Sequence, residues 1–287
     1  MTGGAAALLL MTILAGALMA RIALGKSHGE ETCGDGVGIS QTTGAKEIQA
    51  DAAMTMTSQA GVMLALADGI GRENTGKVCA RLAVDAVLDS FEPYHELHNP
   101  EYFFRTTFME ANSRIQKTIG QRRGGASLAA VFCGGGFIHY AMAGDIRIAL
   151  WRNHEIIPLS KGQTMDVLAI QAYREGRLSR QEAIWSIDEK RIWNYVGRDG
   201  FEELELCERP IRIKPGDKIL MMSRGIFEEL SWSEIEDILE GRETAKVLTG
   251  RLVEAAIAKN DPEMENGSVL LLNIKAEAAD EKDKFRV

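Results

Sequence analysis

Short apolar segments separated by turn residues recur along the chain, and several of them are arranged as hairpins. Residues 127–133 and 137–143 flank a triple glycine at 134–136, and residues 146–159 form a similar pair of segments around Asn153. Glycine and asparagine accept the backbone conformations that join neighbouring antiparallel strands. Segments with helical periodicity are inserted in pairs between the groups of strands. The pattern therefore argues against a repeated strand–helix–strand unit and favours an α+β fold with antiparallel sheets and helices packed outside them.

The remaining elements are predicted from periodicity and from turn residues. Helices are expected where apolar residues recur with the helical repeat, at residues 74–91, 100–119, 164–187, 231–239 and 244–259. Strands are expected for apolar or alternating segments bounded by turns, at residues 37–41, 52–57, 61–67, 204–213, 218–223 and 268–275.

The N-terminal segment is apolar on every face. Residues 5–24 contain a single charge, Arg21, and this length is enough for a helix to cross a bilayer. Arg21 and Lys26 follow the apolar run, which by the positive-inside rule places the rest of the chain in the cytoplasm. We therefore expect a single-pass membrane anchor over residues 1–26; a cleaved signal peptide and a buried helix are the alternatives.

Three further segments complete the predicted organisation. Residues 27–36 are a glycine-rich linker, and their G-x-G pieces lack the G-K-[ST] of a nucleotide-binding loop. Residues 37–275 are expected to form one domain. Residues 276–287 form a charged tail that is predicted to be disordered.

Composition excludes several classes of function. The net charge of −8 argues against a nucleic-acid partner, since binding the phosphate backbone needs clustered Lys and Arg. The four cysteines are widely spaced, which argues against a zinc site and fits a reducing compartment. The five histidines show no metal-ligand spacing and are interpreted as surface or core residues.

Acidic residues next to glycines mark three places where chemistry is expected. Asp68 and Gly69 end an apolar strand, so that a carboxylate and backbone carbonyls are exposed together, as hard cations such as Mg²⁺ prefer. Asp145 follows Gly144 between two strands, and Asp217 lies in a turn that leads to Ser223. Taken alone, Asp68 and Asp145 are each better explained as turn residues.

Together these segments resemble the metal-dependent protein phosphatases of type 2C, the PPM family. The resemblance extends from about residue 36 to residue 275 and rests on five motifs in the family's order. They are ADGIG (67–71), GAS (125–127), GDIR (144–147), IKPGDKILMMSRG (213–225) and ENGSV (265–269). The resemblance implies an antiparallel β-sandwich flanked by helix pairs, in α-β-β-α layers. It also implies two metal ions, Mg²⁺ or Mn²⁺, that activate water for attack on phosphoserine or phosphothreonine.

The resemblance assigns roles to individual residues. Asp68 corresponds to the carboxylate that bridges the metals, Gly69 offers its carbonyl, and Asp145 corresponds to an acid that helps to hold a third metal. In the family's early R-x-x-x-[EDN]-D motif, Lys46 replaces the arginine that binds substrate phosphate. Ala50 replaces an acid in that motif, and Asp51 is kept, so that the resemblance assigns Asp51 to catalysis together with Asp68.

Two positions depart from the family pattern at the metals themselves. Glu265 stands where the last metal-binding aspartate is expected, and it still offers a carboxylate. Arg224 stands where the S-D-G motif has aspartate. A guanidinium has no lone pair to donate and is always charged, so the exchange removes a ligand and adds a positive charge. Arg224 is expected to pair with Asp68 or Glu265, and it retains the ability to bind phosphate.

These departures lead to two hypotheses about function. The first is a pseudophosphatase, a signalling module that binds a phosphoprotein or another signalling partner without turnover. The second is an active Ser/Thr phosphatase with an altered Mg²⁺ or Mn²⁺ site. A third interpretation, a structural domain at the membrane, would be favoured by a pocket without acids and is disfavoured by the presence of Asp68 and Asp145.

Overall fold

The computed structural model describes residues 36–94, 96–187 and 191–274. The predicted anchor at 1–26, most of the predicted linker at 27–36 and the predicted tail at 276–287 lie outside these ranges. Within the described ranges, no helix is both long enough and apolar enough to cross a membrane.

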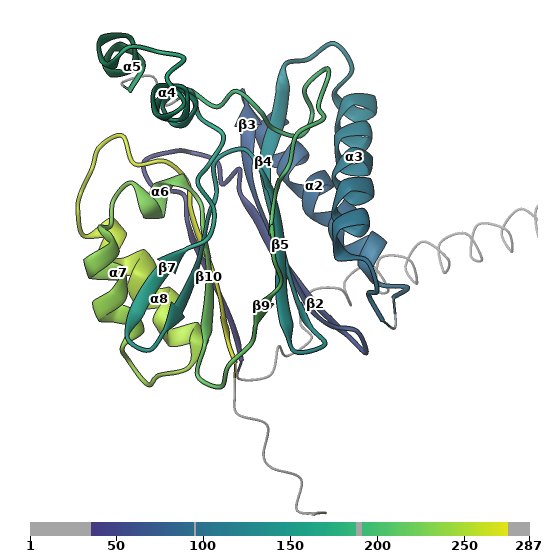
Figure 1. Ribbon diagram of the computed structural model, residues 1–287, viewed down its shortest axis with the longest axis vertical. Helices are drawn as coiled ribbons and strands as arrows, with labels where there is room; N and C mark the ends of the chain where they lie inside the picture. Colours follow the sequence, from purple (N-terminus) through teal and green to yellow (C-terminus); the bar gives the residue numbers. More distant parts are fainter. Residues whose placement is uncertain (1–35, 95, 188–190, 275–287) are drawn as a thin grey trace, which may run out of the picture. The chain divides into compact units, whose positions relative to one another are not determined.

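Two antiparallel sheets form the centre of the domain (Figure 1). One has the order β1-β11-β10-β6-β7, with the bounds Val37–Thr42, Gly267–Asn273, Lys218–Met222, Arg147–Arg152 and Glu155–Pro158. The other has the order β2-β3-β4-β5-β8, with the bounds Ala52–Ser58, Gly61–Gly71, Gly124–Gly134, Phe137–Ala143 and Glu205–Leu206; β9 (Ile211–Arg212) also pairs with β5. The predicted hairpin at the triple glycine is confirmed as the β4–β5 pair.

Helices cover the outer face of each sheet (Figure 1). On the second sheet lie α2 (Thr75–Phe91) and α3 (Pro100–Ile119), and on the first lie α7 (Trp232–Leu239) and α8 (Ala245–Ile257). The predicted α-β-β-α layers are thereby confirmed. Two further helices, α4 (Met165–Arg174) and α5 (Arg180–Ile187), pack against each other.

Alternating side chains of β3 explain how three layers of core arise from two sheets. Met63 and Ala65 pack with Phe108 of α3, whereas Leu64 and Leu66 pack with residues of the opposite sheet. All five of these side chains are fully buried. Because successive side chains of a strand point to opposite faces, an uninterrupted apolar strand is required where both faces are covered.

Two predicted elements are divided in the structure. The helix predicted over 164–187 is interrupted at Gly176, whose φ of +73° is left-handed, and the amides of Arg177 and Leu178 both donate to the carbonyl of Ala172. This is a glycine-terminated helix end. The strand predicted over 204–213 is divided into β8 and β9, with Pro210, which has no amide proton, in the interval. Both short strands, β8 and β9, pair with β5.

A short helix that the sequence did not predict begins at Arg224. This helix, α6 (Arg224–Phe227), directly follows β10 and Ser223. Its start is packed closely: a Cβ on Gly225 would lie 2.2 Å from the Glu265 carbonyl oxygen. Glycine is therefore required for α6 to approach the segment before β11.

Candidate active site

A cleft of about 450 Å³ lies where the ends of several elements meet. The last residues of β3 supply Asp68, Gly69 and Ile70, the first residue of α6 is Arg224, and Glu265 precedes β11. The segment after α5 supplies the remaining lining residues, Arg191, Ile192 and Tyr195. The structure thus brings together Asp68, Gly69, Glu265 and Arg224, although they are far apart in the sequence.

Asp68 carries the most perturbed carboxylate of the cleft. Burial, the strongest influence, and the neighbouring Asp51 raise the pKa of Asp68 well above its usual range, whereas the charge of Arg224 acts in the opposite direction. The backbone beside it is crowded, since a Cβ on Gly69 would lie 2.3 Å from the Gly76 carbonyl oxygen and 2.5 Å from that of Ala50. Only glycine fits next to Asp68.

Asp51 is buried and does not line the cleft. Its Oδ2 accepts hydrogen bonds from Ser223 Oγ at 2.7 Å and from Ser268 Oγ at 2.6 Å. Its Oδ1 is buried without a hydrogen-bond partner among the described residues. Burial raises the pKa of Asp51 to about 6, although both serine hydrogen bonds oppose the rise. Asp51 therefore joins the ends of β10 and β11 behind the cleft.

The basic residues do not pair as the sequence suggested. Lys46 Nζ lies 3.1 Å from Glu265 Oε1, so that Glu265 pairs with Lys46. Within the part of the chain that the structure describes, Arg224 Nε is buried and has no hydrogen-bond partner. Arg224 therefore lines the cleft with Asp68 and Glu265. The ion pair with Glu265 that was expected of Arg224 is formed by Lys46 instead.

Asp145 lies apart from the cleft and lines a neighbouring pocket. It is 4% exposed, and its Oδ1 accepts a hydrogen bond of 2.5 Å from Arg147 Nη1. Its charge nevertheless contributes to the raised pKa of Asp68. Across residues 36–94, 96–187 and 191–274, no group of three Asp, Glu, His or Cys side chains is placed to hold a metal ion.

Arg191 and Tyr195 are cleft residues that sequence reasoning missed. The neighbouring Val196 forms an isolated antiparallel bridge with Ala126 of β4, and this bridge holds the segment across the end of the sheet. A Cβ on Gly125 would lie 2.5 Å from the Tyr195 ring. The glycines at 124–125 were the available signal, because a glycine in a strand often marks close approach by another segment.

The layered fold and this cleft define a phosphatase domain of the PPM class. The family model for "Protein phosphatase 2C" matches residues 42–259, and the chain belongs to this family.

Several bacterial proteins are similar over most of the domain. The Listeria monocytogenes serine/threonine phosphatase stp is 24% identical over 186 residues, covering 62% of this chain and 72% of that protein. Protein phosphatase PhpP of Streptococcus pneumoniae is 25% identical over 230 residues, covering 76% and 88%. Among solved structures, the Streptococcus agalactiae serine/threonine phosphatase has a TM-score of 0.73 at 21% identity, covering 83% of this chain and 99% of that one. The catalytic domain of the phosphatase PstP in complex with two manganese ions has a TM-score of 0.66 at 22% identity, covering 84% and 98%.

Proposed function

We propose that this domain binds phosphoserine or phosphothreonine of a signalling protein in the cleft and hydrolyses it little or not at all. The observation that carries the proposal is the position of Arg224 on the same cleft as Asp68 and Glu265. The proposed partner is a phosphoprotein, and the expected membrane anchor would place the domain close to membrane-bound partners.

The chemistry of the cleft does not fit a pair of divalent ions. Arg224 offers no lone pair, and relative to aspartate it changes the local charge by two units. At the short distances of a metal site, this repulsion costs several kcal/mol even at an effective dielectric constant of about 20. Lys46 further neutralises Glu265, one of the carboxylates expected to bind metal. Metal ions in such a site would lower the pKa of water, and no arginine replaces that role.

The basic residues of the cleft favour binding of a phosphoryl group. Arg191 and Arg224 both line the cleft, and guanidinium groups hold phosphate oxygens through two parallel hydrogen bonds. Ile70, Ile192 and Tyr195 supply an apolar surface beside them for the chain of the bound peptide. The cleft therefore has the charge and the surface needed to retain a phosphorylated side chain.

An active, Mn²⁺- or Mg²⁺-dependent phosphatase is the second candidate. Asp68 favours it, because a bound cation would compensate for the burial that raises the pKa of this carboxylate. The similar proteins carry names of serine/threonine phosphatases, which also favours it. In this case Asp68, the Gly69 carbonyl and Glu265 would hold the metal.

Binding and turnover of one phosphopeptide distinguish the candidates. Binding of the peptide is measured by calorimetry, and phosphate release is measured with and without Mn²⁺. Arg191→Gln and Arg224→Gln are each expected to weaken binding about tenfold or more, since each removes charge-assisted hydrogen bonds. Arg209→Gln is the matched control, because Arg209 is exposed and does not line the cleft. Phosphate-independent binding would contradict the proposal.

A further inference from the structure

A second pocket, of about 270 Å³, has no lining residue in common with the cleft, but the same elements contribute to both. Phe227 of this pocket belongs to α6, as does Arg224 of the cleft. Thr164 of this pocket forms an isolated antiparallel bridge with Ile192 of the cleft. A ligand long enough to leave the cleft over α6 therefore reaches this pocket next.

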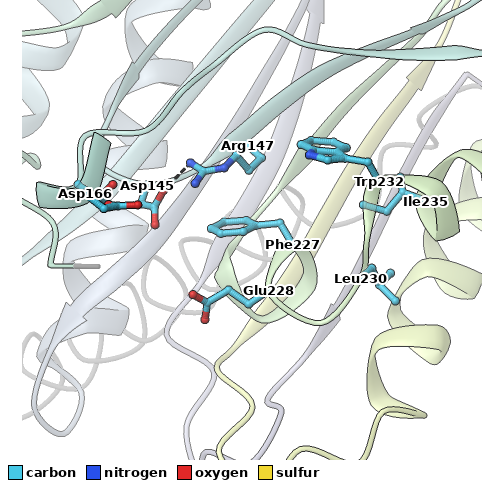
Figure 2. Close-up of a pocket in the computed structure, with 9 residues that line it drawn as sticks. Asp145, Arg147, Asp166, Phe227, Glu228, Leu230, Trp232 and Ile235 are labelled. Atoms are coloured by element: carbon cyan, nitrogen blue, oxygen red, sulfur yellow. Dashed lines mark hydrogen bonds and ion pairs between the residues drawn. The ribbon is translucent and has the colours of Figure 1, made fainter. Parts of the chain in front are cut away.

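One side of the pocket is acidic. Asp145 and Asp166 both line it, and Figure 2 shows the guanidinium of Arg147 directed at Asp145. Glu228 also lines the pocket. Asp145 is satisfied by Arg147, but Asp166 Oδ1 is buried and accepts no hydrogen bond from the described residues. A buried carboxylate oxygen without a donor is costly, and a ligand that donates to it would remove that cost.

The opposite side is aromatic and aliphatic. Trp232, Leu230 and Ile235 lie there (Figure 2), and Trp232 is 38% exposed, which leaves it accessible to a ligand. Between the two sides, the guanidinium carbon of Arg147 lies 4.5 Å from the centre of the Phe227 ring. Arg147 thus already stacks on an aromatic ring while it donates to a carboxylate, which is the kind of contact that a second basic side chain could make in this pocket.

We propose that this pocket binds an arginine or lysine side chain of the same phosphoprotein whose phosphoryl group occupies the cleft, an inference that rests on the proposed function. The charged end of such a side chain donates to Asp166, and its aliphatic stem packs against Trp232 and Leu230. An inorganic cation fits less well, since hard cations require oxygen ligands on most sides and four of the nine lining residues, Phe227, Leu230, Trp232 and Ile235, are apolar. The net charge of −8 on the whole chain also favours a basic partner.

Paired phosphopeptides test the proposal. Fluorescent phosphoserine peptides carry one arginine, moved one position at a time on either side of the phosphoserine, and each is compared with its citrulline counterpart, which has a similar shape but no charge. At the optimal position, the intact chain is expected to bind the arginine peptide about tenfold more tightly, as for a charge-assisted hydrogen bond. Asp166→Asn is expected to abolish this preference. Glu254→Gln, at an exposed position of α8, is the control that retains it.

A second measurement guards against an unfolded variant. The indole N–H resonance of Trp232, assigned by its loss in Trp232→Phe, is expected to shift with the arginine peptide and not with the citrulline peptide. Equal affinity for the two peptides at every position, with phosphate-dependent binding retained, would overturn this inference and leave the proposed function intact. Absence of phosphate-dependent binding would overturn both.

Discussion

Lys46 Nζ and Glu265 Oε1 are 3.1 Å apart, and this ion pair joins the segment after β1 to the residue that precedes Asn266 and β11. Both side chains are about half exposed, at 41% and 46%. Such pairs contribute about 0–1 kcal/mol to stability. The pair therefore matters less for stability than for the charge of the cleft, because it occupies one basic residue and one acidic residue that would otherwise act on a ligand.

Glu265→Gln is expected to raise the affinity for inorganic phosphate several-fold. The substitution removes a negative charge from the cleft and releases Lys46 to meet the anion, which is about the effect of one added charge–charge contact. Calorimetric titration with phosphate measures it, with Glu263→Gln as the control at an exposed position nearby. Equal gains in both variants would show that overall charge, and not the Lys46 pair, sets the affinity.

Asn266→Ala is expected to lower the free energy of unfolding by roughly 2–4 kcal/mol, because three backbone groups, two of them in half-buried residues, lose their side-chain partner. Asn266 Oδ1 accepts from the Ala50 amide at 2.8 Å, and its Nδ2 donates to the carbonyls of Thr43 and Ile48 at 2.9 and 3.0 Å. These bonds hold the segment that carries Lys46 and Asp51, so phosphate affinity is expected to fall as well. Urea denaturation measures the stability.

The control for this prediction is Asn74→Ala. Asn74 is exposed and its side chain makes no capping hydrogen bond to α2. A change of no more than about 0.5 kcal/mol is expected there, as for ordinary surface positions. Similar losses in the two variants would mean that the hydrogen bonds of Asn266 do not position the segment.

His139 is expected to make a contribution to stability that is lost on mild acidification. Burial lowers the pKa of His139 below its ordinary 6.5, and the ring stacks on Phe132 with centroids 6.2 Å apart. At this residue the unfolded chain therefore takes up a proton before the folded one, so the contribution of His139 to the free energy of unfolding falls as the pH drops below 6.5 and levels off below the folded pKa.

The measurement for His139 is urea denaturation across this pH range. Asp51 and Asp68, whose pKa values are raised, act in the opposite direction in the wild type and in His139→Gln alike. On acidification below pH 6.5, His139→Gln is therefore expected to lose less stability than the wild type, or to gain more. His98→Gln, whose side chain is 79% exposed, is expected to behave like the wild type. An unchanged pH profile in His139→Gln would assign the acid sensitivity to other groups.

Arg224→Asp is expected to raise the affinity for Mn²⁺ by at least about tenfold, since it restores a ligand and changes the charge beside Asp68 by two units. Adding Glu265→Asp should improve the geometry further. Calorimetry with Mn²⁺ measures the affinity, and Arg224→Gln separates loss of the positive charge from gain of a ligand. If Arg224→Asp and Arg224→Gln bind Mn²⁺ no better than the wild type, Arg224 is not the obstacle to metal binding.

The sheets and the outer helices could be predicted because their signals are local. Leu64 and Leu66 lie in an uninterrupted apolar run, and the triple glycine at 134–136 marks a turn on its own. The motif at 67–71 likewise located the cleft. Asp68 lies near the end of β3, and that position follows from the local strand pattern without knowledge of distant contacts.

The partners of charged residues could not be predicted, because they depend on side-chain placement between distant segments. Lys46 and Glu265 are brought together by packing of the segment after β1 on the residues before β11, and no local pattern encodes that contact. Arg191 enters the cleft through the bridges formed by Ile192 and Val196, which likewise join distant segments. Gly176 was the visible signal for the division of the predicted helix, and helical periodicity on both sides obscured it.

The most direct test is phosphate release from a phosphopeptide that is shown to bind. We expect the wild-type chain to bind it and, with saturating Mn²⁺, to release phosphate no faster than Asp68→Asn does. The reason is that Arg224 can hold a phosphoryl group but cannot lower the pKa of water. Rapid release that requires Mn²⁺ or Mg²⁺ and is abolished in Asp68→Asn would contradict the account and establish the domain as an active phosphatase.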